Sequence, residues 1–192
     1  RHLWTSVRPN GDNRPHDLNR LEIRICDLVS DPQLLLAITA FCELRLLQLL
    51  QAPERWDPLQ ASALSPAELA RLADANERAS ARASLEASLR HWRDGRPIHC
   101  RQWIEEGLEG LRPLARQEQF EGLLAPLERV LSEGNQAMRW LAQHRSGVSI
   151  AAILSAEAEA MAVQERQLEA GAGQGDASSA TDHTDRQAGV LG

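Results

Sequence analysis

The sequence is poor in aromatic side chains, which make up 4% of its 192 residues, and it has no tyrosine. Leucine, alanine, glutamate, glutamine and arginine predominate instead, and these residues favour helices. This composition therefore predicts a mainly helical chain. The apolar share of 43% and the charged share of 25% are ordinary for a globular protein and argue against a disordered chain.

The chain also lacks an excess of positive charge, because 27 acidic residues outnumber 21 basic ones and give a net charge of -6. Binding to nucleic acid phosphates requires clustered basic surface. The balance of charge therefore argues against DNA or RNA as a partner.

Cysteines are few and widely spaced, at Cys26, Cys42 and Cys100, and they form no disulfide or zinc-site pattern. No leader pattern precedes the first apolar segment, so we expect an internal start and a cytoplasmic protein with reduced thiols. Only 32–51 approaches membrane length. It contains Glu43 and Arg45, which are costly in a bilayer, so we predict a buried core helix and no membrane partner.

Period-two alternation marks one strand at the N-terminal end, where Leu21, Ile23 and Ile25 alternate with charged residues. A second short strand is expected over 3–7, and the segment between them is rich in turn formers. Because two strands are marginal alone, we expect further strands or helices to cover their apolar face.

Helical patterns fill the rest of the chain. Asp31-Pro32 predicts the start of a helix that runs to Leu50, and Ser65-Pro66 followed by Glu68 predicts a capped helix to about Arg93. Later helices are expected over 102–117, 120–143 and from Ser149 to about Glu169. From Gly171 the composition predicts a disordered tail. We therefore predict terminal strands over 1–28, a helical region over 29–169 and a tail over 170–192.

Charged residues crowd into the two strands, and this segment is where chemistry is expected. Glu22 and Arg24 lie two residues apart, about 6.6 Å along a strand, which a metal-bound phosphate can bridge. Carboxylates bind Mg²⁺ and guanidinium groups match phosphate oxygens. The alternative is a solvated strand face on which Arg20, Glu22 and Arg24 form cross-strand ion pairs.

Several motifs carry a resemblance to a known family. The runs Trp4 to Pro9 and Leu21 to Asp27, with Asp31-Pro32 opening an apolar helix, resemble the paired-strand region of the GCS2 carboxylate-amine ligases. Further matches lie at Asn76 to Arg82, Ser84-Leu85-Glu86, Gly134-Asn135 and Ser146 to Ser149. The sequences of 1–11 and 91–95 are similar to those of the cyanobacterial type of glutamate-cysteine ligase.

The resemblance implies an α+β fold, mainly α in this chain, that forms the C-terminal part of a glutamine synthetase-like fold. Two antiparallel strands would be followed by a helical bundle. It also implies that Glu22 is a Mg²⁺ ligand, that Arg24 contacts the transferring phosphate, and that Arg8 binds phosphate or the substrate carboxylate. Arg82 is carried over as a further ATP-binding residue.

The implied activity joins the γ-carboxylate of glutamate to the amine of cysteine through an acyl phosphate. ATP and Mg²⁺ would take part, and γ-glutamylcysteine, the first intermediate of glutathione biosynthesis, would be the product. The N-terminal half of the same protein would supply the remaining acidic ligands, so this chain alone is expected to be inactive. The alternatives are a ligase with another acceptor amine and a non-catalytic helical interaction module.

Overall fold

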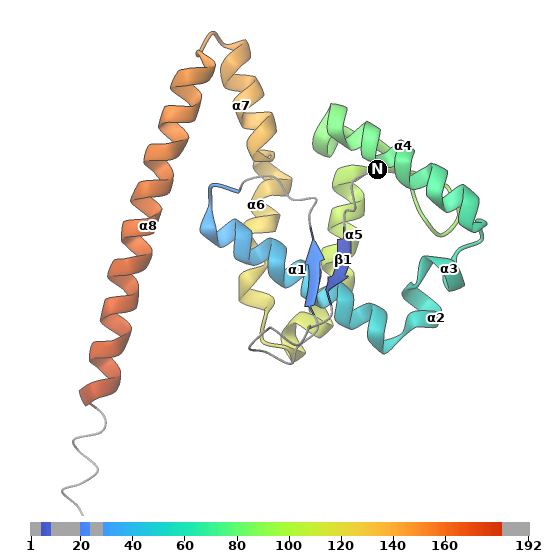
Figure 1. The fold of residues 1–192 in the computed structure, drawn as a ribbon, viewed down its shortest axis with the longest axis horizontal. Helices are drawn as coiled ribbons and strands as arrows, with labels where there is room; N and C mark the ends of the chain where they lie inside the picture. The colour runs from blue at the N-terminus through green and yellow to red at the C-terminus, as the bar shows by residue number, and fades with distance from the viewer. Residues whose placement is uncertain (1–4, 9–19, 24–28, 182–192) are drawn as a thin grey trace, which may run out of the picture.

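The computed structural model describes residues 5–8, 20–23 and 29–181. It has a mainly helical α+β architecture, as predicted, with two short antiparallel ladders (Figure 1). The elements are, in order, β1 (Thr5–Arg8), β2 (Arg20–Ile23), α1 (Pro32–Gln51), α2 (Pro53–Trp56), α3 (Pro58–Ala61), α4 (Pro66–Ala83), η1 (Ser84–Glu86), β3 (Ser88–Arg90), β4 (Pro97–His99), α5 (Cys100–Gln117), η2 (Glu121–Leu123), α6 (Ala125–Glu133), α7 (Gln136–Arg145) and α8 (Ile150–Thr181).

The predicted N-terminal strand pair is confirmed. β1 and β2 run antiparallel, with Ser6 opposite Glu22 and Arg8 opposite Arg20. Ile23, at the end of β2, is 38% exposed. The alternating pattern thus forms a ladder, but the described part of the chain leaves this apolar side chain partly open to solvent.

Helix α1 begins where the sequence predicts, because the Asp31 carboxylate accepts a hydrogen bond of 2.9 Å from the Gln33 backbone N–H and proline occupies the first turn. Only one face is buried, through Ala37, Ala40 and Leu44. The prediction of a buried core helix therefore holds for that face alone. Within the described ranges, α1 is also the one helix whose length and composition would allow it to cross a membrane.

The predicted helix from Pro66 to Arg93 is correct at its start and wrong at its end. Ser65 and Glu68 form the expected capping box, but α4 stops at Ala83 and Ser84 takes a left-handed φ of 53°. The chain then forms the β3–β4 hairpin, in which Leu89 pairs with Ile98. The Asp94-Gly95 segment, which directly follows the predicted helix end at Arg93, is the hairpin turn, with Gly95 at a φ of 74°.

The later helices are close to those predicted, with one interruption. The segment 120–143 is divided between η2, α6 and α7, because Gly134 has a φ of 91° and Asn135 caps α7 by accepting from the Met138 N–H at 3.0 Å. Ser149 Oγ accepts from the Ala152 N–H at 3.2 Å and so caps the last helix as expected.

Helix α8 extends to Thr181, past the predicted boundary near Glu169 and into the segment for which the sequence predicts a disordered tail. The segment is glycine-rich but alanine-containing and free of proline, so no residue forbids continuation of the helix. Residues 182–192 lie outside the described residues.

The main core lies where α1, α5 and α6 meet. Leu44 of α1 and Leu111 of α5 are fully buried there, with Leu124 and Leu131 from the following segment. A smaller cluster consists of Leu89 and Ile98 of the β3–β4 hairpin and of Ala87 just before it. Figure 1 shows α7 and α8 as a helical hairpin on one side of this body and α2 to α4 on the other.

Candidate functional site

The predicted site positions Arg8 and Glu22 lie on the same two-stranded ladder. Arg8 pairs with Arg20 and Glu22 pairs with Ser6, so the backbone positions of Arg8 and Glu22 are two residues apart in the register. The Glu22 side chain is half-buried. The ladder therefore brings together two of the positions at which the sequence predicts phosphate and metal chemistry.

The other two predicted residues are not placed on this ladder. Arg24 lies outside the described residues. Arg82 is exposed in the last turn of α4, a helix that packs mainly on β3 and η1. The roles of Arg8, Arg24 and Arg82 stay predictions.

A magnesium site needs several oxygen ligands, and one or two protein carboxylates usually provide part of them. The described residues contain no group of three or more His, Cys, Asp or Glu side chains that could hold a metal ion. Glu22 alone does not form a Mg²⁺ site, so the residues in hand do not fit the metal without further ligands.

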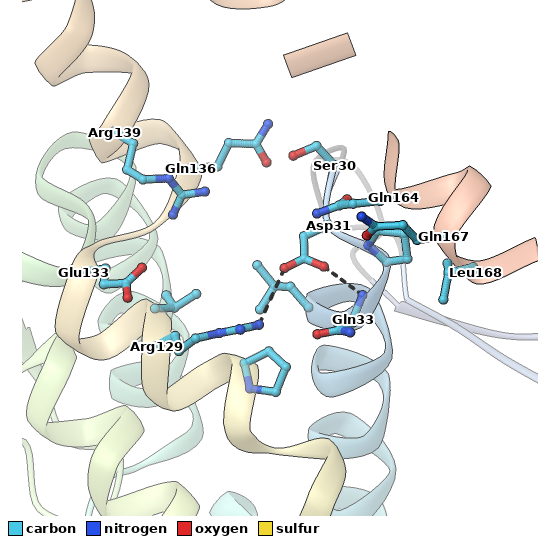
Figure 2. A pocket seen from close by; sticks show the side chains of 14 residues that line it. Ser30, Asp31, Gln33, Arg129, Glu133, Gln136, Arg139, Gln164, Gln167 and Leu168 are labelled. Carbon is cyan, nitrogen blue, oxygen red and sulfur yellow. Dashed lines mark hydrogen bonds and ion pairs between the residues drawn. The ribbon is translucent and has the colours of Figure 1, made fainter. Parts of the chain in front are cut away.

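A polar pocket of about 590 Å³ lies between the start of α1, α6, α7 and α8. Figure 2 shows Asp31 near its centre, with Arg129, Glu133, Gln136 and Arg139 on the α6–α7 side and Gln164, Gln167 and Leu168 on α8. Arg129 Nη2 lies 3.9 Å from Asp31 Oδ2. Arg139 Nη1 donates to the Gly134 carbonyl at 2.9 Å.

Next to this pocket, a hydrogen-bond network joins three segments that are far apart in the sequence. The Glu157 carboxylate of α8 accepts from the hydroxyl of buried Ser30, and it also accepts from Trp140 Nε1 of α7 at 3.2 Å. The network links α8 to the start of α1. It also satisfies the one polar side-chain atom of Trp140, an atom that usually has a partner when an indole is buried.

The charges of this pocket suit a small zwitterion. Guanidinium groups of Arg129 and Arg139 could bind a carboxylate, while Asp31 and Glu133 could accept from an ammonium group. Sequence reasoning missed this pocket because its residues are spread over four elements. The pocket also contains four glutamines, of which Gln33 and Gln136 lie in the first turns of α1 and α7 and Gln164 and Gln167 lie within α8.

Two histidines lie at the β3–β4 hairpin, and among the described residues neither belongs to a group of three or more side chains that could hold a metal ion. His91 is 8% exposed and stacks on Trp92, with ring centroids 5.7 Å apart. Burial lowers the pKa of His91, and the positive charge of Arg96 lowers it further. Burial also raises the pKa of the Cys100 thiol, which argues against a reactive thiolate.

Comparison with known proteins decides the family. The family model described as Glutamate-cysteine ligase family 2 (GCS2) matches residues 1–178, which is most of the chain. The chain belongs to glutamate-cysteine ligase family 2. No curated protein and no solved structure was found to match it.

Membership of glutamate-cysteine ligase family 2 confirms the resemblance stated from the motifs, although the cyanobacterial type stays a prediction. The helical α+β architecture and the antiparallel strand pair agree with the glutamine synthetase-like fold expected for this family. Family membership also supports a ligase that joins a carboxylate to an amine.

Proposed function

We propose that the parent enzyme of this chain joins the γ-carboxylate of L-glutamate to the amine of L-cysteine and forms γ-glutamylcysteine for glutathione biosynthesis. The match to glutamate-cysteine ligase family 2 over residues 1–178 is the observation that carries this proposal. The strand pair β1–β2, which positions Arg8 and Glu22, supports it. ATP and Mg²⁺ are the proposed cofactors and the cytoplasm the proposed location.

The proposed reaction has two steps. An oxygen of the glutamate γ-carboxylate attacks the γ-phosphorus of ATP, which forms an acyl phosphate and releases ADP. The cysteine amine then attacks the acyl carbon, loses a proton and expels inorganic phosphate. In this scheme Arg8 and Arg24 are the catalytic side chains that stabilise negative charge on the transferring group, and Arg82 contacts ATP.

We propose that Glu22 contributes one ligand to Mg²⁺ and that other parts of the parent enzyme contribute the rest. The described residues offer no metal-binding cluster by themselves. The isolated chain should accordingly show no ligase turnover, and measurable turnover by the purified chain would overturn this proposal.

Exposed apolar side chains support a further part of the proposal, namely that the N-terminal half of the same protein covers this chain. Ile23 on β2 is 38% exposed, while Leu36 and Leu50 on α1 are 57% and 76% exposed. Large apolar side chains on β2 and α1 are thus open to solvent and could be covered by another part of the parent protein. Neither nucleic acid nor a membrane is part of the proposal.

Phosphate release by the full-length parent tests the function. ATP, Mg²⁺ and glutamate are supplied with and without cysteine, and native protein is compared with Glu22→Gln and with Glu77→Gln, which changes an exposed residue of α4. We expect cysteine-dependent release of phosphate. Loss of an outer-shell partner of a metal ligand lowers activity roughly 10-fold to 100-fold, so Glu22→Gln, which removes a proposed ligand itself, should lower the release by more than that. Glu77→Gln should leave it unchanged.

Two other functions have distinct outcomes in the same assay. Release that depends on another amine but not on cysteine would indicate a ligase with a different acceptor. No release with any amine would indicate a non-catalytic helical interaction module. A Glu22→Gln variant as active as the native enzyme would remove the metal role of Glu22 while leaving the ligase assignment in place.

A further inference from the structure

A second cavity, of about 780 Å³, lies between α1, α2, the turn of the β3–β4 hairpin and α5. It is lined by arginine and tryptophan side chains that are far apart in the sequence. Three of these arginines belong to different elements: Arg45 to α1, Arg55 to α2 and Arg93 to the hairpin turn. None of the residues assigned to the ligase reaction takes part.

The three arginines converge on one ring. The guanidinium carbons of Arg45, Arg55 and Arg93 lie 5.2, 5.1 and 5.1 Å from the centroid of Trp56. Arg93 also lies 4.5 Å from the ring of Trp92. Stacking on an indole stabilises a cation, but it places three like charges close together.

Acidic side chains do not balance these charges within the described part of the chain. The two carboxylates that line the cavity, Asp94 and Glu106, both pair with Arg96, at 3.8 and 3.5 Å. Arg45 donates to the Gln48 side chain, and Arg93 Nη2 donates to the Arg55 carbonyl at 2.8 Å. Both acceptors are neutral, and among the described residues none of the three arginines forms an ion pair, so their positive charges are not compensated by this part of the chain.

The electrostatic consequence is visible at Arg45. Its guanidinium is half-buried, and burial together with the charge of Arg93 lowers the pKa of Arg45 below its ordinary value. A cluster of cations in a chain with a net charge of -6 is unexpected unless something neutralises it.

We propose that this cavity binds a phosphate-bearing anion with at least two negative charges, held by Arg45, Arg55 and Arg93. The planar donor forks of arginine match phosphate oxygens, and one phosphate can accept from several guanidinium groups at once. A carboxylate carries a single charge, so it compensates the cluster less well. A nucleotide and a free phosphate or pyrophosphate share this chemistry, and the experiment separates them.

Isothermal titration calorimetry on the full chain, in metal-free buffer of low ionic strength, tests the site with inorganic phosphate, pyrophosphate, ADP and citrate. We expect pyrophosphate to bind and added salt to weaken that binding. Pyrophosphate should also raise the melting temperature of the chain in a thermal unfolding experiment. The paired variant Arg45→Gln/Arg93→Gln should lower the affinity about 100-fold, at about 10-fold for each lost charge-assisted contact. Arg71→Gln, an exposed arginine of α4 outside the cavity, should leave it unchanged.

A second pair of variants protects the test against loss of folding. Arg45→Lys/Arg93→Lys keeps both charges but removes the donor forks, so we expect a smaller loss of affinity, about 10-fold. Tighter binding of ADP than of pyrophosphate would identify a nucleotide as the source of the phosphate, and the reverse order would identify a free phosphate compound.

Three results would overturn the proposal. They are an absence of binding for inorganic phosphate, pyrophosphate and ADP alike, an unchanged affinity in both paired variants, and citrate binding as tightly as pyrophosphate. These results concern the arginine cavity alone. Since the ligase proposal is tested by phosphate release and by Glu22→Gln, failure of one does not imply failure of the other.

Discussion

The two short ladders of this chain differ in how they are covered. In the β3–β4 hairpin, Leu89 and Ile98 are 7% and 3% exposed, because α4 and α5 pack on it. In the β1–β2 ladder, which has longer strands, Ile23 is 38% exposed. Two strands gain stability from cover rather than from their own hydrogen bonds. The described residues therefore cover the β3–β4 ladder but leave Ile23 of the β1–β2 ladder partly open to solvent.

Truncation of one apolar side chain in each ladder gives the largest expected contrast. Ile98→Ala removes buried methyl groups and should lower the free energy of unfolding by about 2–5 kcal/mol, as in other cores. Ile23→Ala, at an exposed position, should change it by no more than about 0.5 kcal/mol. Urea unfolding followed by circular dichroism measures both.

Equal losses for the two variants would contradict the contrast, since they would mean that β1–β2 is packed within this chain. The comparison can be repeated in the longer protein proposed above. If its N-terminal half covers Ile23 as proposed, Ile23→Ala should become clearly destabilising there.

The next effect concerns the link between α4 and the covered hairpin. The Asn76 side chain accepts from the Arg90 N–H at 2.9 Å and donates to the Arg90 carbonyl at 2.8 Å. Asn76→Ala leaves both backbone groups without these partners and should lower the free energy of unfolding by about 1–2 kcal/mol. Gln102→Ala is a suitable control, because Gln102 is exposed and bonds only the side chain of Glu106 at 2.8 Å.

A loss of stability in Asn76→Ala no greater than in the Gln102→Ala control would mean that packing alone holds the hairpin on α4. The same urea measurement decides this.

The two ladders also show which elements can be predicted from sequence. β1–β2 was predictable because its alternation is local and strict, and the starts of α1 and α4 were predictable because Asp31 and Ser65 are themselves the caps. The β3–β4 hairpin was missed because 84–90 consists largely of helix formers. Its strand pairing depends on 97–99 and on burial by α5, which no local pattern records.

The two candidate sites also differ in how far they could be predicted from the sequence. Arg8 and Glu22 could be predicted as neighbours because they lie on one local strand pair. The arginine cavity could not, because Arg45, Arg55 and Arg93 meet only when α1, α2 and the hairpin turn pack together. The sequence did carry one weak signal, since Arg55-Trp56 and Trp92-Arg93 each place an arginine beside a tryptophan.

The smallest expected effect is a dependence of the free energy of unfolding on pH, which we expect from the β3–β4 ladder alone. His91 lies at the turn of β3–β4, whereas β1 and β2 contain no histidine. His91 Nδ1 accepts from the Arg93 N–H at 3.1 Å, which requires that this nitrogen carry no proton. Burial is the main cause that lowers the pKa of His91; the charge of Arg96 lowers it further, and those of Asp94 and Glu106 oppose the shift.

The sign of the effect follows from linkage. In the unfolded chain His91 has the ordinary histidine pKa of about 6.5, so below that pH the unfolded state takes up a proton before the folded state does. Stability is therefore complete above about pH 6.5 and falls as the pH falls toward the lowered pKa of the folded state, by up to about 1.4 kcal/mol for each pH unit in that window. Urea unfolding from pH 8 to pH 5 should show this slope in the native chain and in His144→Gln, an exposed control. It should be reduced in His91→Gln, and an equal slope in all three chains would show that other groups govern the acid sensitivity of the fold.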